Sequence, residues 1–270
     1  MEAQLEECIL ERQGCPIRYW LGGTAGRPLV VFTHGACVDH RSFNANLPVV
    51  AQDYRVLTWD VRAHGLSRPA GAPFSVPLAV EDLLAILDRV GTQKAVLVGH
   101  SNGTYISQEL VFRYPEMVQA IVIADGTCIT WPRSALDRWI LNASSPIMSL
   151  LPDATLKKAG LPYFSARKDV QAYITECFSL LPKREFIAIW NAVTTCLHEE
   201  PDYQIARPML LVHGDRDQTG DIKKIAPRWA AASPNCQYEV IPNAMHMAMM
   251  DNPEFFNRVL MAFLQKWVPA

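Results

Sequence analysis

Six short apolar runs of strand length recur along the chain, and segments with helical spacing separate most of them. The runs are rich in β-branched residues and occupy positions 29–33, 55–59, 94–98, 120–124, 208–212 and 237–241. Because these runs are apolar on both faces, they suit the middle of a parallel sheet that is covered by helices.

Three segments between or after these runs have helical periodicity. In the clearest, apolar residues stand three and four positions apart from Val80 to Val90, and the pattern ends at Gly91. A second follows Gly103, and a third spans 253–267. Strands that alternate with helices indicate βαβ crossovers, so the predicted fold class is α/β, with a doubly wound, mostly parallel central sheet.

The alternation breaks once, over residues 127–205, which show many prolines and short helical stretches but no strand pattern. We therefore predict a core made of 1–126 and 206–270, with 127–205 inserted as a helical cap. An apolar substrate pocket would draw on cap tryptophans and on a methionine cluster near the chain end. The candidates for substrate binding are Trp131, Trp139, Trp190 and Met247.

Composition narrows the function classes. Half of the residues are hydrophobic, 19% are charged and the formal net charge is −2, without the clustered Lys and Arg that nucleic acid requires. The sequence has no apolar run long enough to cross a bilayer, and its acidic start does not resemble a secretory signal. Seven cysteines without C-x-x-C spacing indicate reduced thiols. We expect a cytoplasmic monomer or homodimer that acts on a small molecule without metal or cofactor.

Residues 99–103 read Gly-His-Ser-Asn-Gly, directly after one strand-like run and before a helical segment. In such a strand-turn-helix elbow the serine sits on a sharp, strained turn, and the residues two positions away must be small. Ser101 is therefore the predicted nucleophile. Because a serine hydroxyl is a weak nucleophile at neutral pH, it needs a base, and the base needs an orienting acid.

Among seven histidines, His246 best fits the base. It lies on a short loop between the run 237–241 and the final helical segment, at the sheet edge where α/β proteins bind ligands. We expect His100, inside the elbow, to point into the sheet, and His34 and His213 to hold loop backbone.

Three carboxylates compete for the role of the acid. Asp217 is the first choice, since it stands on the loop after the run 208–212 and can lean toward His246. Asp215 on the same loop is the second, and Asp125, which ends the preceding strand-like run, is the third. One of the three would be structural, capping a helix or bonding loop amides.

Together these motifs resemble the α/β-hydrolase superfamily, in its cap-bearing, single-domain branch, over nearly the whole chain. The resemblance rests on His34-Gly35, the segment 60–67, the elbow, Tyr114-Pro115-Glu116, the segment 214–217 and Met245-His246. The order Ser101, Asp217, His246 is that of the superfamily. The chain departs from the pattern at Ala63 and Thr104, where glycine is common.

The resemblance implies an oxyanion hole made of the backbone N–H groups of Ala36 and Asn102. Ser101 argues against haloalkane dehalogenases and epoxide hydrolases of this fold, which carry Asp at the elbow. We expect a carboxylesterase-like serine hydrolase that acts through an acyl-enzyme on a small-to-medium hydrophobic ester, lactone or thioester.

Two alternatives stay open. An inward-turned cap arginine would favour carbon–carbon bond hydrolysis of a diketo acid, and the candidates are Arg133, Arg138, Arg167 and Arg184. A non-hydrolytic ligand receptor or a lyase could use the same fold.

Overall fold

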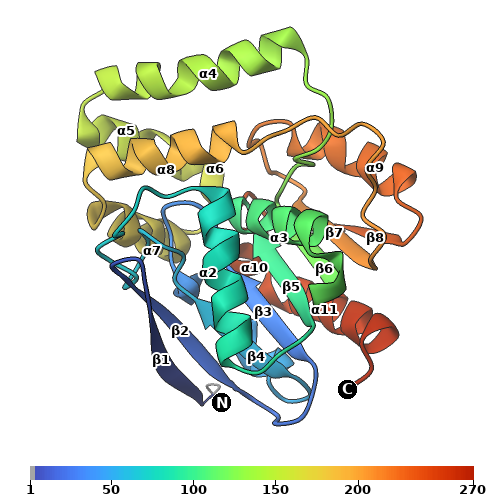
Figure 1. Ribbon diagram of the computed structural model, residues 1–270. Coiled ribbons are helices and arrows are strands. Elements are labelled where there is room, and N and C mark those ends of the chain that lie inside the picture. Colours follow the sequence, from blue (N-terminus) through green and yellow to red (C-terminus); the bar gives the residue numbers. More distant parts are fainter. Residues whose placement is uncertain (1–3) are drawn as a thin grey trace.

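The computed structural model describes residues 4–270, and its centre is an eight-stranded sheet. The strands are β1 (Leu5–Arg12), β2 (Cys15–Gly23), β3 (Leu29–Thr33), β4 (Arg55–Trp59), β5 (Ala95–His100), β6 (Val118–Ala124), β7 (Met209–Gly214) and β8 (Cys236–Ile241). Their order across the sheet is β1-β2-β4-β3-β5-β6-β7-β8 (Figure 1). The pairs from β4 to β8 are parallel, whereas β1 and β2 pair antiparallel with each other and β2 pairs antiparallel with β4. The predicted fold class is confirmed.

All six predicted strands are present, within two residues of their predicted bounds. The hairpin of β1 and β2 was not predicted. β1 (LEECILER) lies at the sheet edge with its residues alternately half-buried and exposed along most of its length, so it carries charges that break the continuous apolar pattern. β3 and β5, in the middle of the sheet, are wholly buried.

Helices cover both faces of the sheet. The longer ones are α2 (Val76–Arg89), α3 (Asn102–Arg113), α9 (Ile222–Ala232) and α11 (Pro253–Trp267). Short helical turns are η1 (His40–Phe43), α1 (Leu47–Val50), η2 (Pro115–Met117) and α10 (Ala248–Asp251). Figure 1 shows α2 and α3 on one face and α11 on the other.

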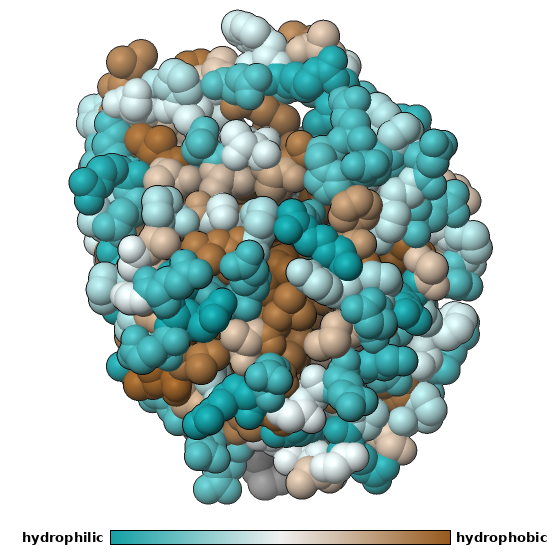
Figure 2. All heavy atoms as spheres, in the orientation of Figure 1, coloured by the Kyte–Doolittle hydropathy of each residue, from teal (hydrophilic) through white to brown (hydrophobic). Residues whose placement is uncertain are grey.

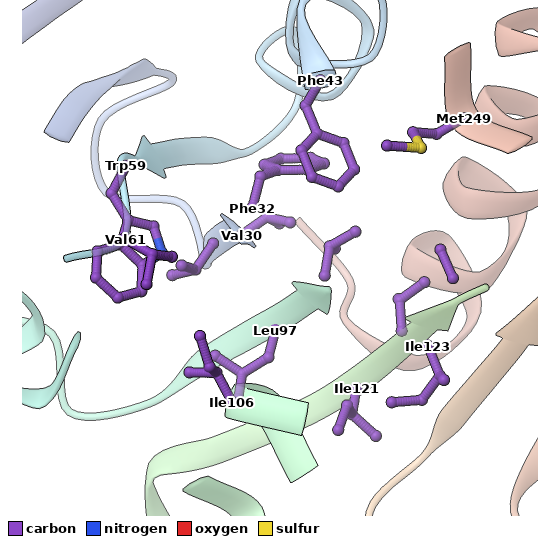
Figure 3. Packing of buried hydrophobic residues seen from close by; sticks show 14 of the residues in the cluster. Val30, Phe32, Phe43, Trp59, Val61, Leu97, Ile106, Ile121, Ile123 and Met249 are labelled. Carbon is purple, nitrogen blue, oxygen red and sulfur yellow. The ribbon is translucent and has the colours of Figure 1, made fainter. Parts of the chain in front are cut away.

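The core is continuous through the sheet. On one face, Ile106 of α3 packs toward Leu97 of β5, and on the other Phe43 of η1 lies against Phe32 of β3, with ring centroids 5.2 Å apart (Figure 3). This double coverage explains why the central strands are apolar on both faces. All seven cysteines are free thiols, as predicted.

Residues 127–205 form five helices and no strand, and they gather at one end of the sheet (Figure 1). These helices are α4 (Ala135–Leu150), α5 (Asp153–Ala159), α6 (Leu161–Phe164), α7 (Lys168–Ser179) and α8 (Lys183–Thr195). The segment leaves the core after β6, whose carboxyl end lies beside that of β5. The helices therefore gather at the edge where the elbow of Ser101 emerges.

A buried ion pair fixes the loop after β4. Arg62, with no exposed surface, donates to both carboxylate oxygens of Asp82 at 2.7 and 2.8 Å, and its remaining N–H groups bond the Ala70 and Arg12 carbonyls. Asp82 stands on α2 and is equally buried. The segment 60–67 is thereby tied to α2 and to the β1–β2 hairpin.

Arg62→Ala should lower the free energy of unfolding by about 3–5 kcal/mol, because it leaves the buried Asp82 carboxylate without its main partner. Urea unfolding measures the effect. Arg18→Ala is the matched control, since Arg18 pairs with Glu7 at the surface, where such a pair contributes less than about 1 kcal/mol. Equal losses in the two variants would contradict a structural role for the buried pair.

Candidate active site

Ser101 occupies a strained turn between β5 and α3. Its backbone angles are φ 49° and ψ −117°, in a region that L-residues rarely adopt. The surrounding structure holds this conformation: the Ser101 N–H donates to the Ala124 carbonyl at 2.9 Å, and the Ser101 carbonyl accepts from the Thr104 N–H at 2.9 Å. The turn thus presents the Ser101 side chain at the carboxyl end of β5.

Both glycines of the elbow are needed for close packing. A β carbon on Gly103 would lie 2.0 Å from the Thr33 carbonyl oxygen, and one on Gly99 would lie 2.5 Å from the Gly103 backbone. The Gly-x-Ser-x-Gly spacing is therefore a steric requirement of this turn.

A chain of hydrogen-bond contacts joins the three residues that the sequence singled out. Ser101 Oγ lies 3.0 Å from His246 Nε2, and His246 Nδ1 lies 3.1 Å from Asp217 Oδ2. His246 and Asp217 are both buried. Nucleophile, base and orienting acid require these contacts in this order.

Asp217 is suited to hold a negative charge. Burial alone would raise the pKa of Asp217, but the bond from His246 and the Thr219 N–H, which donates to Oδ1 at 2.7 Å, outweigh burial and hold that pKa below its ordinary range. The carboxylate can therefore orient the imidazole and balance a positive charge on it.

The two rival carboxylates have other partners. Asp215 accepts the Ala244 N–H at 3.0 Å and so ties its own loop to the loop that carries His246. Asp125 is fully buried, and its two oxygens accept the N–H groups of Gly214 at 2.9 Å and Ala248 at 3.2 Å. Burial and the neighbouring Asp217 raise the pKa of Asp125 well above its ordinary value. Asp125 thus ties together the loops that carry the predicted acid and base.

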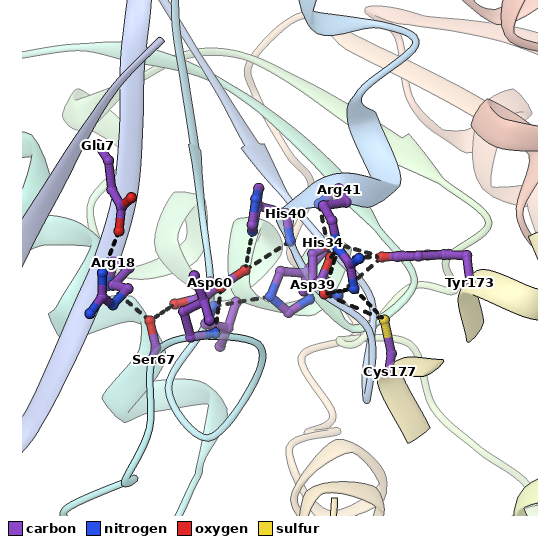
Figure 4. Close-up of polar contacts among 12 residues, drawn as sticks. Glu7, Arg18, His34, Asp39, His40, Arg41, Asp60, Ser67, Tyr173 and Cys177 are labelled. Atoms are coloured by element: carbon purple, nitrogen blue, oxygen red, sulfur yellow. Dashed lines mark hydrogen bonds and ion pairs between the residues drawn. The ribbon is translucent and has the colours of Figure 1, made fainter. Parts of the chain in front are cut away.

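Within residues 4–270, two sets of side chains have the composition of metal ligands. Asp125, Asp217 and His246 form one, and Asp39, His40 and Asp60 form the other. In the second set Asp60 accepts from the His40 backbone and ring at 2.8 Å each (Figure 4). In both sets N–H donors already engage the carboxylates, so the donor pattern fits hydrogen-bonded braces better than cation coordination.

The loop after β3 passes directly beside the elbow. A β carbon on Gly35 would lie 2.7 Å from His100 Nδ1 and 3.2 Å from Ser101 Cβ, so only glycine allows this approach. Ala36 follows in the chain. Asn102 is the first residue of α3, where N–H groups have no acceptor within the helix. The backbone segments of both predicted oxyanion donors therefore adjoin Ser101.

The same loop is tied to α7, a contact that the sequence did not indicate. Asp39 accepts from the Arg41 guanidinium and lies 3.2 Å from the Tyr173 hydroxyl, while Cys177 Sγ is 3.4 Å from Asp39 Oδ2 (Figure 4). Tyr173 and Cys177 both belong to α7. Helix α7 thus anchors the loop that begins with Gly35.

His34 and His213 hold loop backbone, as predicted, and so does His100, which was expected to point into the sheet. His34 lies between the Gly35 carbonyl at 2.7 Å and the Val61 N–H at 3.0 Å. His100 Nε2 lies 2.7 Å from the His246 carbonyl, so the elbow directly supports the loop that carries His246. His213 Nδ1 lies 2.8 Å from the Gly214 carbonyl.

Three of the buried histidines resist protonation. Burial lowers the pKa of His34, and burial together with a neighbouring histidine lowers the pKa of His64 and of His100 to about 3. A group whose pKa is depressed in the folded state resists protonation while the unfolded chain takes up protons. The folding stability that these neutral histidines contribute is therefore fully present above about pH 6.5, and it is lost as the pH falls toward 3.

Between pH 7.5 and pH 5, the free energy of unfolding should fall by about 2 kcal/mol for each of His64 and His100, because the unfolded chain protonates them and the folded chain does not. Urea unfolding across this range measures the slope against pH. In His64→Gln, the number of protons taken up on unfolding between pH 6.5 and 5 should fall by up to about one, and the slope of the free energy of unfolding against pH should fall with it. An unchanged slope would show that His64 does not resist protonation.

The four predicted substrate contacts occupy different surroundings. Met247 is buried beside His246, and its N–H donates to the Phe164 carbonyl at 3.0 Å. Trp190 Nε1 donates to Ser144 Oγ at 2.8 Å and so joins α8 to α4. Trp131 lines two surface cavities of about 260 and 500 Å³, and Trp139 is 66% exposed on α4. Of the four, Met247 adjoins the His246 loop.

Phe164 is a site neighbour that the sequence did not reveal. Its ring centroid lies 5.6 Å from that of His246. Two further phenylalanines continue an edge-to-face row behind it. The ring centroids of Phe164 on α6 and Phe178 on α7 are 6.0 Å apart, and those of Phe178 and Phe186 on α8 are 5.0 Å apart. This row extends from His246 into α6, α7 and α8, and nothing in its sequence spacing distinguishes it from ordinary core.

Comparisons with known proteins agree with this architecture. A family model described as alpha/beta hydrolase fold matches residues 28–253. A 3-oxoadipate enol-lactonase 1 from Acinetobacter baylyi is 25% identical over 262 residues, or 95% of this chain and 96% of that protein. A serine hydrolase-like protein from Danio rerio is 32% identical over 106 residues, so the match spans only 38% of this chain and 32% of that relative.

Among solved structures, the enol-lactonase from Burkholderia xenovorans LB400 is similar in fold, with a TM-score of 0.82 and 18% identity. The alignment covers 96% of this chain and 100% of that one. Within residues 4–270, no helix has both the length and the apolar character needed to cross a membrane.

Proposed function

The chain belongs to the alpha/beta hydrolase fold family, and from this premise we propose that it is a serine hydrolase whose nucleophile is Ser101. Its substrates are small-to-medium hydrophobic esters, lactones or thioesters, cleaved through an acyl-enzyme. The observation that carries the proposal is the contact chain from Ser101 Oγ through the His246 ring to Asp217, at 3.0 and 3.1 Å.

In the proposed reaction, Ser101 Oγ attacks the substrate carbonyl carbon while its proton passes to His246 Nε2. Asp217 stabilises the resulting imidazolium through Nδ1. The oxyanion of the tetrahedral intermediate accepts from the backbone N–H groups of Ala36 and Asn102. His246 then returns the proton to the leaving oxygen or sulfur, and the acyl group remains on Ser101.

Hydrolysis of the acyl-enzyme repeats these steps with water. His246 takes a proton from the water as its oxygen attacks the acyl carbon, and the same two N–H groups hold the second oxyanion. Collapse of that intermediate returns the proton to Ser101 Oγ and releases the carboxylic acid. No redox step is involved, so the reaction requires only the substrate and water.

We further propose that residues 127–205 are a cap over this site. The contact between Phe164 and the His246 ring supports this role, as does the tie between α7 and the loop at Asp39. Met247 and the row of phenylalanines would supply apolar surface for the acyl or alcohol part of the substrate.

The pairing of the cap arginines favours this substrate class over a diketo acid. Three of the four cap arginines are engaged by carboxylates: Arg133 by Asp221, Arg138 by Glu199 and Arg167 by Asp169, at 3.0, 2.7 and 2.6 Å. Arg184, the fourth, is exposed. A substrate carboxylate would have to break one of these pairs to gain an inward-facing arginine. The relative from Acinetobacter baylyi is named as an enol-lactonase, in keeping with lactones as substrates.

A fluorophosphonate probe tests the nucleophile, and a substrate panel tests the class. We expect mass spectrometry to locate the probe on Ser101, and p-nitrophenyl acetate and butyrate to give a burst from acyl-enzyme formation. The panel adds lactones, thioesters and a diketo acid. Absence of both labelling and burst would sink the hydrolase proposal and leave the receptor or lyase reading, which binding without turnover would support.

A further inference from the structure

Helix α4 turns its apolar side to the solvent. Its large apolar side chains recur at helical spacing on one face and are 51–84% exposed; they are Leu136, Trp139, Ile140, Ile147 and Leu150. Brown, apolar side chains reach the upper rim of the molecule over this helix in the space-filling view (Figure 2). In a soluble protein such a stripe normally faces the core. We call these five residues the α4 stripe.

The opposite side of α4 holds the helix in place, partly through polar contacts. Ser144 Oγ accepts from Trp190 Nε1 at 2.8 Å, and Ser145 Oγ lies 3.4 Å from Asn191 Oδ1. Within residues 4–270, α8 is the one element with which α4 packs extensively. The α4 stripe is therefore exposed because the helix is anchored by its other face.

Unpaired cations lie near the carboxyl end of the stripe. Lys183 Nζ donates to the Ser149 carbonyl in the last turn of α4, and Arg184 beside it and Lys158 on α5 are exposed. The neighbouring acids are already engaged, Asp153 by Lys157 at 2.9 Å and Glu185 by Arg68 at 2.7 Å. This local positive surplus stands on a chain whose net charge is −2.

These features fit a lipid surface better than a second copy of the chain. α4 has 16 residues and is about 24 Å long, so pairing it with its own copy would bury less than the roughly 1,200–2,000 Å² of a stable interface. A helix with apolar side chains including tryptophan on one face, with cations beside them, has the character of an interfacial helix. The cations would contact lipid phosphates.

We propose that α4 is an interfacial helix that docks the protein on surfaces of anionic phospholipid. The α4 stripe enters the boundary between headgroups and acyl chains, while Lys158, Lys183 and Arg184 meet the phosphates. Docking places the inserted helices between the lipid and Ser101, so that apolar substrates dissolved in lipid can reach the site. This last consequence rests on the proposed hydrolase function, whereas the docking itself does not.

Co-sedimentation with phosphatidylcholine vesicles, with and without about 30% phosphatidylglycerol, tests the docking. The wild type should bind the anionic vesicles, and high salt should weaken binding. Ile147→Glu should reduce binding about tenfold or more, because it puts a charge into the stripe. Asn142→Glu adds the same charge to an exposed position of α4 outside the stripe and should bind like wild type.

Lys183→Gln with Arg184→Gln should weaken binding to the anionic vesicles only. The proposal is overturned if the wild type binds neither vesicle, or if Ile147→Glu and wild type bind alike. It is also overturned if sedimentation equilibrium shows a wild-type dimer that Ile147→Glu dissociates, without vesicle binding, because the stripe would then be a contact between copies.

Enzyme assays separate this proposal from the hydrolase function. Ile147→Glu should hydrolyse soluble p-nitrophenyl acetate at the wild-type rate, which also shows that the variant folds. Ser101→Ala should bind vesicles like wild type. Vesicle binding without hydrolysis of any substrate would leave the docking standing and remove the hydrolase function.

Discussion

Ser101→Ala should lower kcat on p-nitrophenyl esters by about 10⁴-fold or more while the protein stays folded. The substitution removes the oxygen that lies 3.0 Å from His246 Nε2, so the proposed acyl-enzyme could not form. Alanine keeps the backbone turn at φ 49° and its bond to the Ala124 carbonyl, which is why we expect urea unfolding to match wild type closely.

Steady-state and burst kinetics on the purified variant measure this effect. Ser107→Ala is the matched control, since Ser107 is a buried serine of α3, the helix that follows Ser101, and its hydroxyl donates to the Gly103 carbonyl at 2.9 Å. It should cost stability, at about 1 kcal/mol, but little turnover. A Ser101→Ala variant within tenfold of wild type would mean that another group attacks the substrate.

The central strands could be predicted because a single physical cause shaped their sequence. β3 and β5 are buried on both faces, so nearly every position along them favours an apolar residue. The β1–β2 hairpin escaped prediction for the opposite reason. Its edge strand is half exposed, and its stability comes from pairing with β2, a long-range contact that leaves only a weak pattern.

The site was predictable where chemistry and chain position coincide. Ser101 and His246 each follow a strand at the edge where the sheet binds ligands, and both lie in the contact chain that the structure shows. The surrounding support was not predictable. Phe164 reaches His246, and Asp39 meets Tyr173, through the packing of α6 and α7 onto the core, and neither spacing nor composition encodes those contacts.

The choice of the acid illustrates the same limit. Sequence left Asp217, Asp215 and Asp125 open because all three stand at or just after the end of a strand. Loop packing separates them: Asp215 and Asp125 accept backbone N–H groups, and Asp217 meets the imidazole. These distances depend on how two loops lie together, which a linear pattern does not record.

Asp217→Asn should lower kcat by about 10³–10⁴-fold, with little change in KM. Asparagine keeps the shape of the side chain but cannot balance the positive charge on His246, and its amide N–H₂ can favour the wrong imidazole tautomer. Asp125→Asn should cost less turnover and more stability, because it disturbs the bonds from Gly214 and Ala248 without removing the partner of the imidazole. Kinetics and urea unfolding on both variants and on the double variant measure the difference.

The double variant decides how the two carboxylates act. If Asp125 only braces the loops, its loss should multiply the Asp217→Asn defect by no more than the single Asp125→Asn factor. If Asp125 can orient His246 when Asp217 is replaced, the kcat of the double variant should lie well below the value expected from multiplying the effects of the two single substitutions. A larger kcat loss in Asp125→Asn than in Asp217→Asn would reassign the acid to the end of β6. The two loops would then have to rearrange, because both Asp125 oxygens now accept backbone N–H groups.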